Sequence, residues 1–354
     1  MADEMRTTHN AGDVLDDTAA ATPRFLHILN GDSVRGTLEQ SDVPGAFVPY
    51  VDILHEGPVP SENGNPSWRE TRARYLSASG YVSYADALRT YEEWDARAAT
   101  FAEYDEVVLW FEHDLFDQLL LVRHLDWFSR RDLGRTALSL ICIGEFPGFE
   151  PFHGLGQLDA SQLASLLGTR EVVSREQFAL GQRAWSAFTS TDPTELDALS
   201  RGQEADELPY LAGALRRFLE EYPAVGTGLP RTERHVLEVL LEGARSPAEL
   251  FVALQSREER VFMGDWTFWY RLREMARGVA PLVSLDVEPR DDPDLPAGVV
   301  TITDTGRAVL SGRADWVRVN GFDRWLGGVH LSAALGAEVP WRYDPSSGSV
   351  VGAR

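Results

Sequence analysis

Apolar runs alternate with longer helical stretches in the first half of the chain, and this alternation constrains the fold more than any other feature. The last two runs are continuously aliphatic or β-branched, which is typical of strands that are covered on both faces. Strands separated by helices favour a parallel sheet, because each parallel connection needs a crossover. We interpret four runs as strands, namely residues 24–29, 47–54, 106–111 and 137–143.

The intervening stretches have helical character. We expect helices over residues 67–78, 83–101 and 115–129, the last of which is apolar nearly all round and should be a buried crossover helix. Asp114 fits the N-cap position of that helix. These elements predict an α/β fold, with a Rossmann-like, doubly wound parallel sheet of about four strands over residues 24–151.

The flanking segments differ in character. Residues 1–23 are acidic and lack an apolar period, so we expect a disordered tail. Residues 152–228 form a helical region with clear start signals. Two of these signals look like capping boxes, in which Asp159 pairs with Gln162 and Ser174 pairs with Gln177.

Residues 229–319 predict a winged-helix-like domain. Three helices are expected over 231–242, from Ser246 onward and over 265–277, and two extended segments then follow an order typical of a wing. The loop at 288–295 between those segments is acidic and should repel phosphate groups, so we favour a protein contact or a lid over DNA recognition. The C-terminal tail, residues 320–354, has no assigned place in this scheme.

Charge and composition narrow the chemistry. The chain has 354 residues and a formal net charge of −22, which weighs against charge-driven binding to nucleic acid or an anionic membrane but leaves a local basic face open. It contains no lysine, which excludes a Walker A lysine and a pyridoxal-phosphate Schiff base. The single cysteine, Cys142, excludes an intramolecular disulfide and a multi-cysteine zinc site.

These features agree with a cytoplasmic protein. One cysteine suits a reducing compartment, and the sequence has neither a signal-peptide pattern nor an apolar run long enough for a membrane span.

Polar side chains follow each predicted strand, where the ligands of open α/β sheets usually bind. Carboxylates in these positions are Asp32, Asp52, Glu56, Glu112 and Glu145, and the imidazoles are His55 and His113. A divalent cation such as Mg²⁺ or Mn²⁺ prefers carboxylate oxygens, whereas acid–base catalysis needs carboxyl or imidazole groups with separated pKa values. Both uses stay open for this set.

The segment around Asn30 offers a second type of site. Gly31 permits a tight turn, and Ser33 at a helix start leaves backbone N–H groups free for an anion. Simple helix capping by Asp32 or Ser33 explains the same residues equally well.

The strongest pattern is Glu112-His113-Asp114, directly after an apolar strand. Alternation along the strand sends Glu112 and Asp114 to one side and His113 to the other. Capping accounts for Asp114, with Asp117 as its partner, but it does not account for the other two residues. Arg72, on a following helix, could bind an oxyanion if it points over the sheet edge, although an ordinary surface arginine is the commoner case.

These motifs resemble a bacterial family known as domain of unknown function 1835. The similarity rests on the segments 26–33, 52–58 and 109–118, and continues through Gly154 to the Trp325-Leu326-Gly327-Gly328 motif. The family has no established reaction, so the resemblance implies a bacterial, cytoplasmic setting and supports the choice of residues without supplying a mechanism.

We therefore expect an enzyme, either a hydrolase or a transferase, that acts on a phosphate-bearing or nucleotide-like ligand at the sheet edge. The alternative is a non-enzymatic, ligand-sensing regulator with the winged-helix domain as its output module, which would contact a protein partner or, less in keeping with its acidic loop, nucleic acid. The expected catalytic residues are Asp32, His55, Glu112 and His113; the expected ligand-binding residues are His27, Asn30, Gly31, Ser33, Glu56 and Arg72; and the possible metal ligands are Asp32, Asp52, Glu112 and Asp114.

Overall fold

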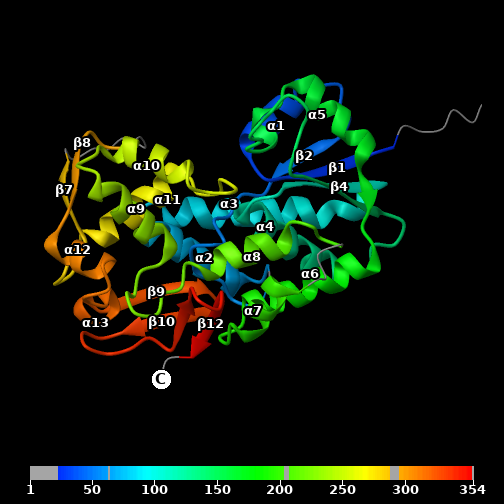
Figure 1. Cartoon of the computed structure of the whole chain (residues 1–354). Helices are drawn as coiled ribbons and strands as arrows, with labels where there is room; N and C mark the ends of the chain where they lie inside the picture. Colours follow the sequence, from blue (N-terminus) through cyan, green and yellow to red (C-terminus); the bar gives the residue numbers. More distant parts are fainter. Residues whose placement is uncertain (1–22, 63, 203–206, 288–294, 353–354) are drawn as a thin grey trace, which may run out of the picture.

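A five-stranded sheet organises the first half of the molecule (Figure 1). The computed structural model describes residues 23–62, 64–202, 207–287 and 295–352. The strand order is β2-β1-β4-β5-β6; the first four are mutually parallel, and β6 pairs antiparallel with β5. The strands are β1 (Phe25–Leu29), β2 (Ala46–Pro49), β4 (Glu106–Glu112), β5 (Ala137–Ile143) and β6 (Glu171–Val172).

All four predicted strands are present; three bounds, the start of β1, the start of β2 and the end of β4, differ by one residue, and one end differs by more. The second ends at Pro49 rather than at residue 54, because the chain then turns, and the Leu54 N–H donates to the Asp52 carbonyl. The fifth strand, β6, is only two residues long and was not predicted.

Helices cover both faces of the sheet. α1 (Asp32–Leu38) and α5 (Ala160–Leu166) pack on one face, in an apolar cluster that contains Leu29, Val108 and Trp110. α3 (Tyr84–Ala98) and α4 (Leu115–Ser129) pack on the other face, against the alternate residues of the same strands (Figure 1). The order of the strands reverses between β1 and β4, so the chain leaves the sheet centre in both directions.

The helix starts follow their capping signals. α4 has exactly the predicted bounds, with Asp114 as its N-cap, and nearly all of it is buried. Both predicted capping boxes are present, at the starts of α5 and α6 (Arg175–Phe188). The remaining helices of this half are α2 (Pro66–Ala78), α7 (Thr194–Arg201) and α8 (Leu211–Leu219).

The next region contains three helices and a hairpin, in the predicted order. The helices are α9 (Arg231–Leu241), α10 (Pro247–Gln255) and α11 (Asp265–Met275). They are followed by the antiparallel pair β7 (Val283–Val287) and β8 (Gly298–Ile302), then by α12 (Asp304–Leu310) and α13 (Trp316–Asn320). Most of the acidic loop between β7 and β8, and nearly all of the predicted N-terminal tail, lie outside the described residues.

The C-terminal segment, unassigned from the sequence, forms strands that pack against the N-terminal half. These are β9 (Phe322–Gly327), β10 (Val329–Ala333), β11 (Trp341–Asp344) and β12 (Ser349–Gly352). β9 pairs in parallel with β3 (Gly57–Pro58), and the Val59 N–H donates to the Gly327 carbonyl at 2.9 Å. Within the described chain, no helix combines the length and the apolar character that a membrane crossing needs.

Candidate functional site

Three carboxylates meet where the strand order reverses. Asn30 directly follows β1, Glu112 ends the neighbouring strand β4, and Asp114 and Asp117 lie at the start of α4. One carboxylate oxygen from each of the three acidic residues lies within 4.8 Å of the others. Their exposed fractions are 5%, 6% and 2%, so the group is almost completely shielded from solvent. We call Glu112, Asp114 and Asp117 the carboxylate cluster.

Short hydrogen bonds fix this cluster. The Asn30 side-chain amide donates to Glu112 Oε1 at 2.6 Å and to Asp117 Oδ2 at 3.1 Å. The Glu112 backbone N–H donates to Asp117 Oδ1 at 2.9 Å, and the Asp117 N–H donates to Asp114 Oδ1 at 3.0 Å. These bonds join the end of β4 to the start of α4. The acidic side chains converge there because they also cap free backbone N–H groups.

A glycine lets the covering loop approach the cluster. Gly154 has φ +138°, and a Cβ there would lie 1.7 Å from Glu112 Oε2. The next residue, Leu155, donates its backbone N–H to the same carboxyl group. A larger residue at position 154 would push the loop away from Glu112.

Burial makes it costly to ionise all three acids together. Desolvation and the nearby Asp114 raise the pKa of Glu112 to about 8. Desolvation likewise raises the pKa of Asp114 to about 6, and it raises the pKa of Asp117 above its ordinary value, with further contributions from Glu112 and Asp114. Glu112 therefore retains its proton at neutral pH unless a cation compensates the charge of the cluster.

The cluster has the donor types of a hard-cation site. Carboxylate and amide oxygens are the preferred ligands of Mg²⁺, Mn²⁺ and Ca²⁺. Asn30 Oδ1 is buried and has no hydrogen-bond partner among the described residues, although buried polar atoms are usually paired. An amide flip would turn this oxygen toward the carboxylates and would suit a cation between them.

His113 lies apart from the carboxylates, as strand alternation predicts. Its ring stacks against Phe152 at 6.0 Å between centroids and meets the edge of Tyr210. Its backbone carbonyl accepts a hydrogen bond from Arg260 Nη1 at 3.0 Å. Desolvation, with a contribution from Arg260, lowers the pKa of His113 to about 4, so the imidazole is neutral at pH 7.

Asp52 and Arg72 do not join the cluster, contrary to the prediction that they lie at the same edge. The two form a completely buried ion pair, in which Arg72 Nη2 lies 2.7 Å from Asp52 Oδ1. Arg72 also donates to the backbone carbonyls of Ile53, Glu56 and Pro58. It therefore fixes the loop after β2 and is not available to a ligand in this arrangement.

Glu56 also has a protein partner. Its carboxylate accepts from Arg271 Nε at 2.8 Å and from the Tyr75 hydroxyl at 3.2 Å. Glu56 and Arg271 line a cleft of about 880 Å³, together with residues of α11, β9 and β10. This pair joins the loop after β2 to α11 and so connects distant parts of the chain.

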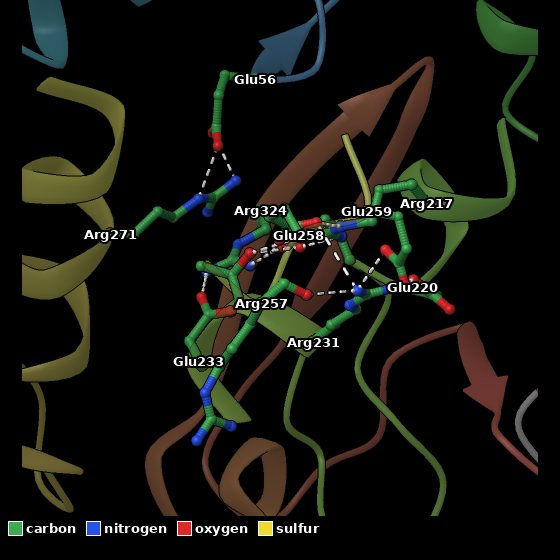
Figure 2. A network of polar contacts seen from close by, with 12 residues as sticks. Glu56, Arg217, Glu220, Arg231, Glu233, Arg257, Glu258, Glu259, Arg271 and Arg324 are labelled. Carbon is green, nitrogen blue, oxygen red and sulfur yellow. Dashed lines mark hydrogen bonds and ion pairs between the residues drawn. The ribbon is translucent and has the colours of Figure 1, made fainter. Parts of the chain in front are cut away.

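Further ion pairs extend near this contact (Figure 2). Arg324 on β9 contacts Glu233 and Glu221, and Glu221 in turn binds Arg217 at 2.7 Å. The other close pairs are Arg217–Glu258, Arg231–Glu220 and Arg231–Glu259. We call these residues, together with Glu56 and Arg271, the buried ion network, although the Glu259 side chain at its edge is 73% exposed.

The other proposed residues take separate positions. His55 is buried between the ring edges of Phe116 and Phe262, away from any carboxylate hydrogen bond. His27 lies within β1, where its ring contacts the Pro44 carbonyl and the Trp110 indole N–H. Glu145 is exposed after β5.

The start of α1 corrects the prediction for the Asn30 segment. Gly31 is the N-cap and has extended backbone, with φ −174°, so neither a glycine-requiring turn nor capping by Asp32 or Ser33 occurs. Asp32 is exposed and pairs with Arg35 at 2.9 Å. Ser33 lies beside the covering loop, where a Cβ on Gly156 would be 3.2 Å from its hydroxyl.

Sequence reasoning assigned Asp117 only a capping role. Its N–H does donate to Asp114, but its carboxylate faces Glu112 and Asn30 rather than returning to the Asp114 backbone. The signal was present in the sequence as a third acid, three residues after Asp114 at a helix start.

Comparison with known proteins gives no relative, since neither a protein-family model nor a curated protein matches the chain. The resemblance to domain of unknown function 1835 therefore stays a prediction.

Proposed function

We propose that the chain is a metal-assisted hydrolase or transferase, acting on a phosphate-bearing or nucleotide-like ligand at the carboxyl edge of the sheet. The observation that carries this proposal is the carboxylate cluster, buried at the reversal of strand order between β1 and β4. We classify the sheet as Rossmann-like on its strand order and two-sided helical cover, and ligands of such sheets bind at this position.

In this proposal Glu112, Asp114 and Asp117 bind Mg²⁺ or Mn²⁺, with Asn30 as a fourth ligand. A bound divalent cation would polarise a phosphoryl oxygen and lower the pKa of a coordinated water. Asn30 orients two of the carboxylates, and the loop at Gly154 excludes bulk water from Glu112. His113 is neutral and can accept a proton on the opposite side of the segment.

Cation binding tests the first step. We expect wild-type protein to bind Mn²⁺, as measured by calorimetry, and we expect Glu112→Gln and Asp117→Asn to weaken binding by more than roughly tenfold, because each removes a ligand charge. Glu145→Gln is the matched control, since Glu145 also follows a strand but is exposed.

Stability supplies an independent readout of the same site. In metal-free buffer Glu112→Gln should raise the melting temperature. The variant has one fewer buried carboxyl group, so the cost of ionising neighbouring acids together is smaller. Mn²⁺ at about 100 times its dissociation constant should add roughly 2.7 kcal/mol to wild type. Absence of cation binding by wild type, or an equal loss in Glu145→Gln, would overturn the proposal. Binding should then be followed by assays of phosphate-ester hydrolysis and phosphoryl transfer with Mg²⁺.

The contacts between the sheet and the second half support an alternative, a ligand-sensing regulator. We interpret α9, α10, α11 and the β7–β8 hairpin as a winged-helix-like output module. Two links join it to the site region: Arg271 on α11 binds Glu56, and Arg260 before α11 binds the His113 carbonyl. Cation binding without any turnover, together with a cation-dependent protein partner, would favour this alternative.

A further inference from the structure

A separate pocket is lined by the residues on either side of Asp114 in the sequence. It has a volume of about 390 Å³ and lies between α8, the segment before α11 and the chain at His113. Its lining includes His113 and Leu115, which flank Asp114 in the sequence. The pocket therefore begins at the backbone that carries one of the three clustered acids. Its volume falls within the range of small-molecule sites.

The charges that line this pocket do not cancel. Its lining contains four arginines and three glutamates. All three glutamates are engaged in the buried ion network, because Arg217 binds Glu258 at 2.7 Å, and Arg231 binds Glu220 at 2.6 Å and Glu259 at 2.7 Å. Arg217 and Arg231 thus hold all three glutamates of the lining, and Arg217 also binds Glu221 at 2.7 Å.

The other two arginines, Arg216 and Arg260, have no carboxylate at ion-pair distance within the part of the chain that the structure describes. Arg216 is exposed at the rim. Arg260 donates one nitrogen to the His113 carbonyl, and its guanidinium lies 5.1 Å from the centre of the Tyr210 ring. Two arginines without a carboxylate partner in one pocket are unusual in a chain with a net charge of −22, and they favour an anionic ligand.

His113 adds a buried polar group to the same wall. The residue is only 7% exposed, and its Nδ1 has no hydrogen-bond partner among the described residues. The imidazole ring can offer an N–H donor, which complements the planar donor groups of the arginines. Together these groups match the oxygens of a tetrahedral oxyanion.

We infer that this pocket binds the phosphate group of a phosphate monoester, held by Arg260, Arg216 and His113. The inference deepens the proposed function, since it places the anionic part of the ligand beside the cation site, and it rests on that function only for the reaction. Anion binding itself needs no cation. The volume exceeds what a lone phosphate fills, so a small organic group is expected on the ester.

Calorimetry on metal-free protein tests the inference. Wild type, kept in a chelator, is titrated with inorganic phosphate and with adenosine monophosphate; binding of both, with the ester tighter, is the expected result. Arg260→Met and Arg216→Met should each weaken binding roughly tenfold or more, because each loses a charge-assisted hydrogen bond. Arg257→Met is the control, since Arg257 binds Glu238 at 2.8 Å and does not line the pocket. Because Arg216 is exposed, its variant keeps the test valid if Arg260→Met fails to fold.

The outcomes separate this inference from the proposed function. Phosphate binding that survives in Glu112→Gln, while Mn²⁺ binding is lost, supports both. If wild type binds Mn²⁺ but neither anion, or if Arg257→Met weakens anion binding as much as Arg260→Met, the phosphate pocket is overturned and the cation site stands. If wild type binds the anions but not Mn²⁺, the cation site is overturned and the phosphate pocket stands.

Discussion

His55 shows how a single buried side chain can make stability depend on pH. Neither of its ring nitrogens is hydrogen-bonded to a described residue. Burial lowers its pKa to about 3; the charges of Arg271, Arg72 and Arg217 act in the same direction, and Glu221 opposes them. In the unfolded chain the ordinary pKa is about 6.5. Below that pH the unfolded state therefore binds a proton that the folded state does not.

We expect His55→Leu to reduce the acid sensitivity of the fold. The stability linked to neutral His55 is complete above about pH 6.5 and falls by roughly 1.4 kcal/mol per pH unit toward pH 3. Between pH 7 and pH 5, wild type should therefore lose about 2 kcal/mol more than the variant, measured by urea unfolding. His153→Leu, at an exposed position, is the control. Parallel pH curves for wild type and His55→Leu would contradict this expectation.

At the residue scale, local pattern predicted part of the site. Alternation and capping identified Glu112 and Asp114, and the polar end of β1 identified Asn30, which the structure brings together. Asp52 and Glu56 were misplaced because their positions depend on Arg72 and Arg271. Such long-range ion pairs leave no periodic trace in the sequence around either partner.

At the scale of elements, a close approach between helices decides the effect of a common substitution. Gly181 on α6 faces α4, and a Cβ at that position would lie 2.4 Å from Leu125 Cβ. A Cβ added to Gly36 on α1 would have no other atom within 4 Å. The two glycines are thus a matched pair that differ in packing.

Alanine should have opposite effects at these two positions. Gly36→Ala should stabilise the protein by about 0.5–1 kcal/mol, because alanine is the better helix former. Gly181→Ala should destabilise it by roughly 1–3 kcal/mol, because the added methyl group forces α6 away from α4. Denaturant unfolding measures both, and a gain in stability from Gly181→Ala would refute the packing argument.

Element types were easier to predict than their ends or their partners. α4 is long, apolar and capped, and its bounds were predicted correctly. β6 and β3 have two residues each and carry no usable pattern; they exist through pairing with β5 and β9. The second predicted strand was too long because the apolar residues after Pro49 are buried in a turn rather than in the sheet.

At the scale of the whole molecule, acidity should make stability depend on salt. The net charge of −22 creates repulsion among exposed carboxylates. Raising the salt concentration from about 0.01 M to 0.15 M shortens the screening length from about 30 Å to about 8 Å. The buried ion network is less accessible to screening. We therefore expect the melting temperature to rise over this range, with an uncharged osmolyte of equal osmolality as the control; a fall would mean that exposed ion pairs dominate.

The overall arrangement exceeded what the sequence could predict. The order of helices and strands followed from periodicity, and the sheet followed from the alternation of the first half. The position of the C-terminal strands could not be predicted from periodicity, because it is determined by the surface that they cover. Arg324, in an apparently unremarkable tail, proved to bind Glu233 within the protein interior.

The pairing of β3 with β9 has a consequence for synthesis on the ribosome. Gly57 lies beside Leu326, so its pairing waits for a residue made 269 positions later in the chain. At about 5–20 residues per second, that wait lasts on the order of tens of seconds. The strands β1, β2, β4 and β5 can assemble meanwhile, but the loop at Glu56 lacks its β9 partner until that strand has been made. Chaperones that hold nascent chains would find their target there.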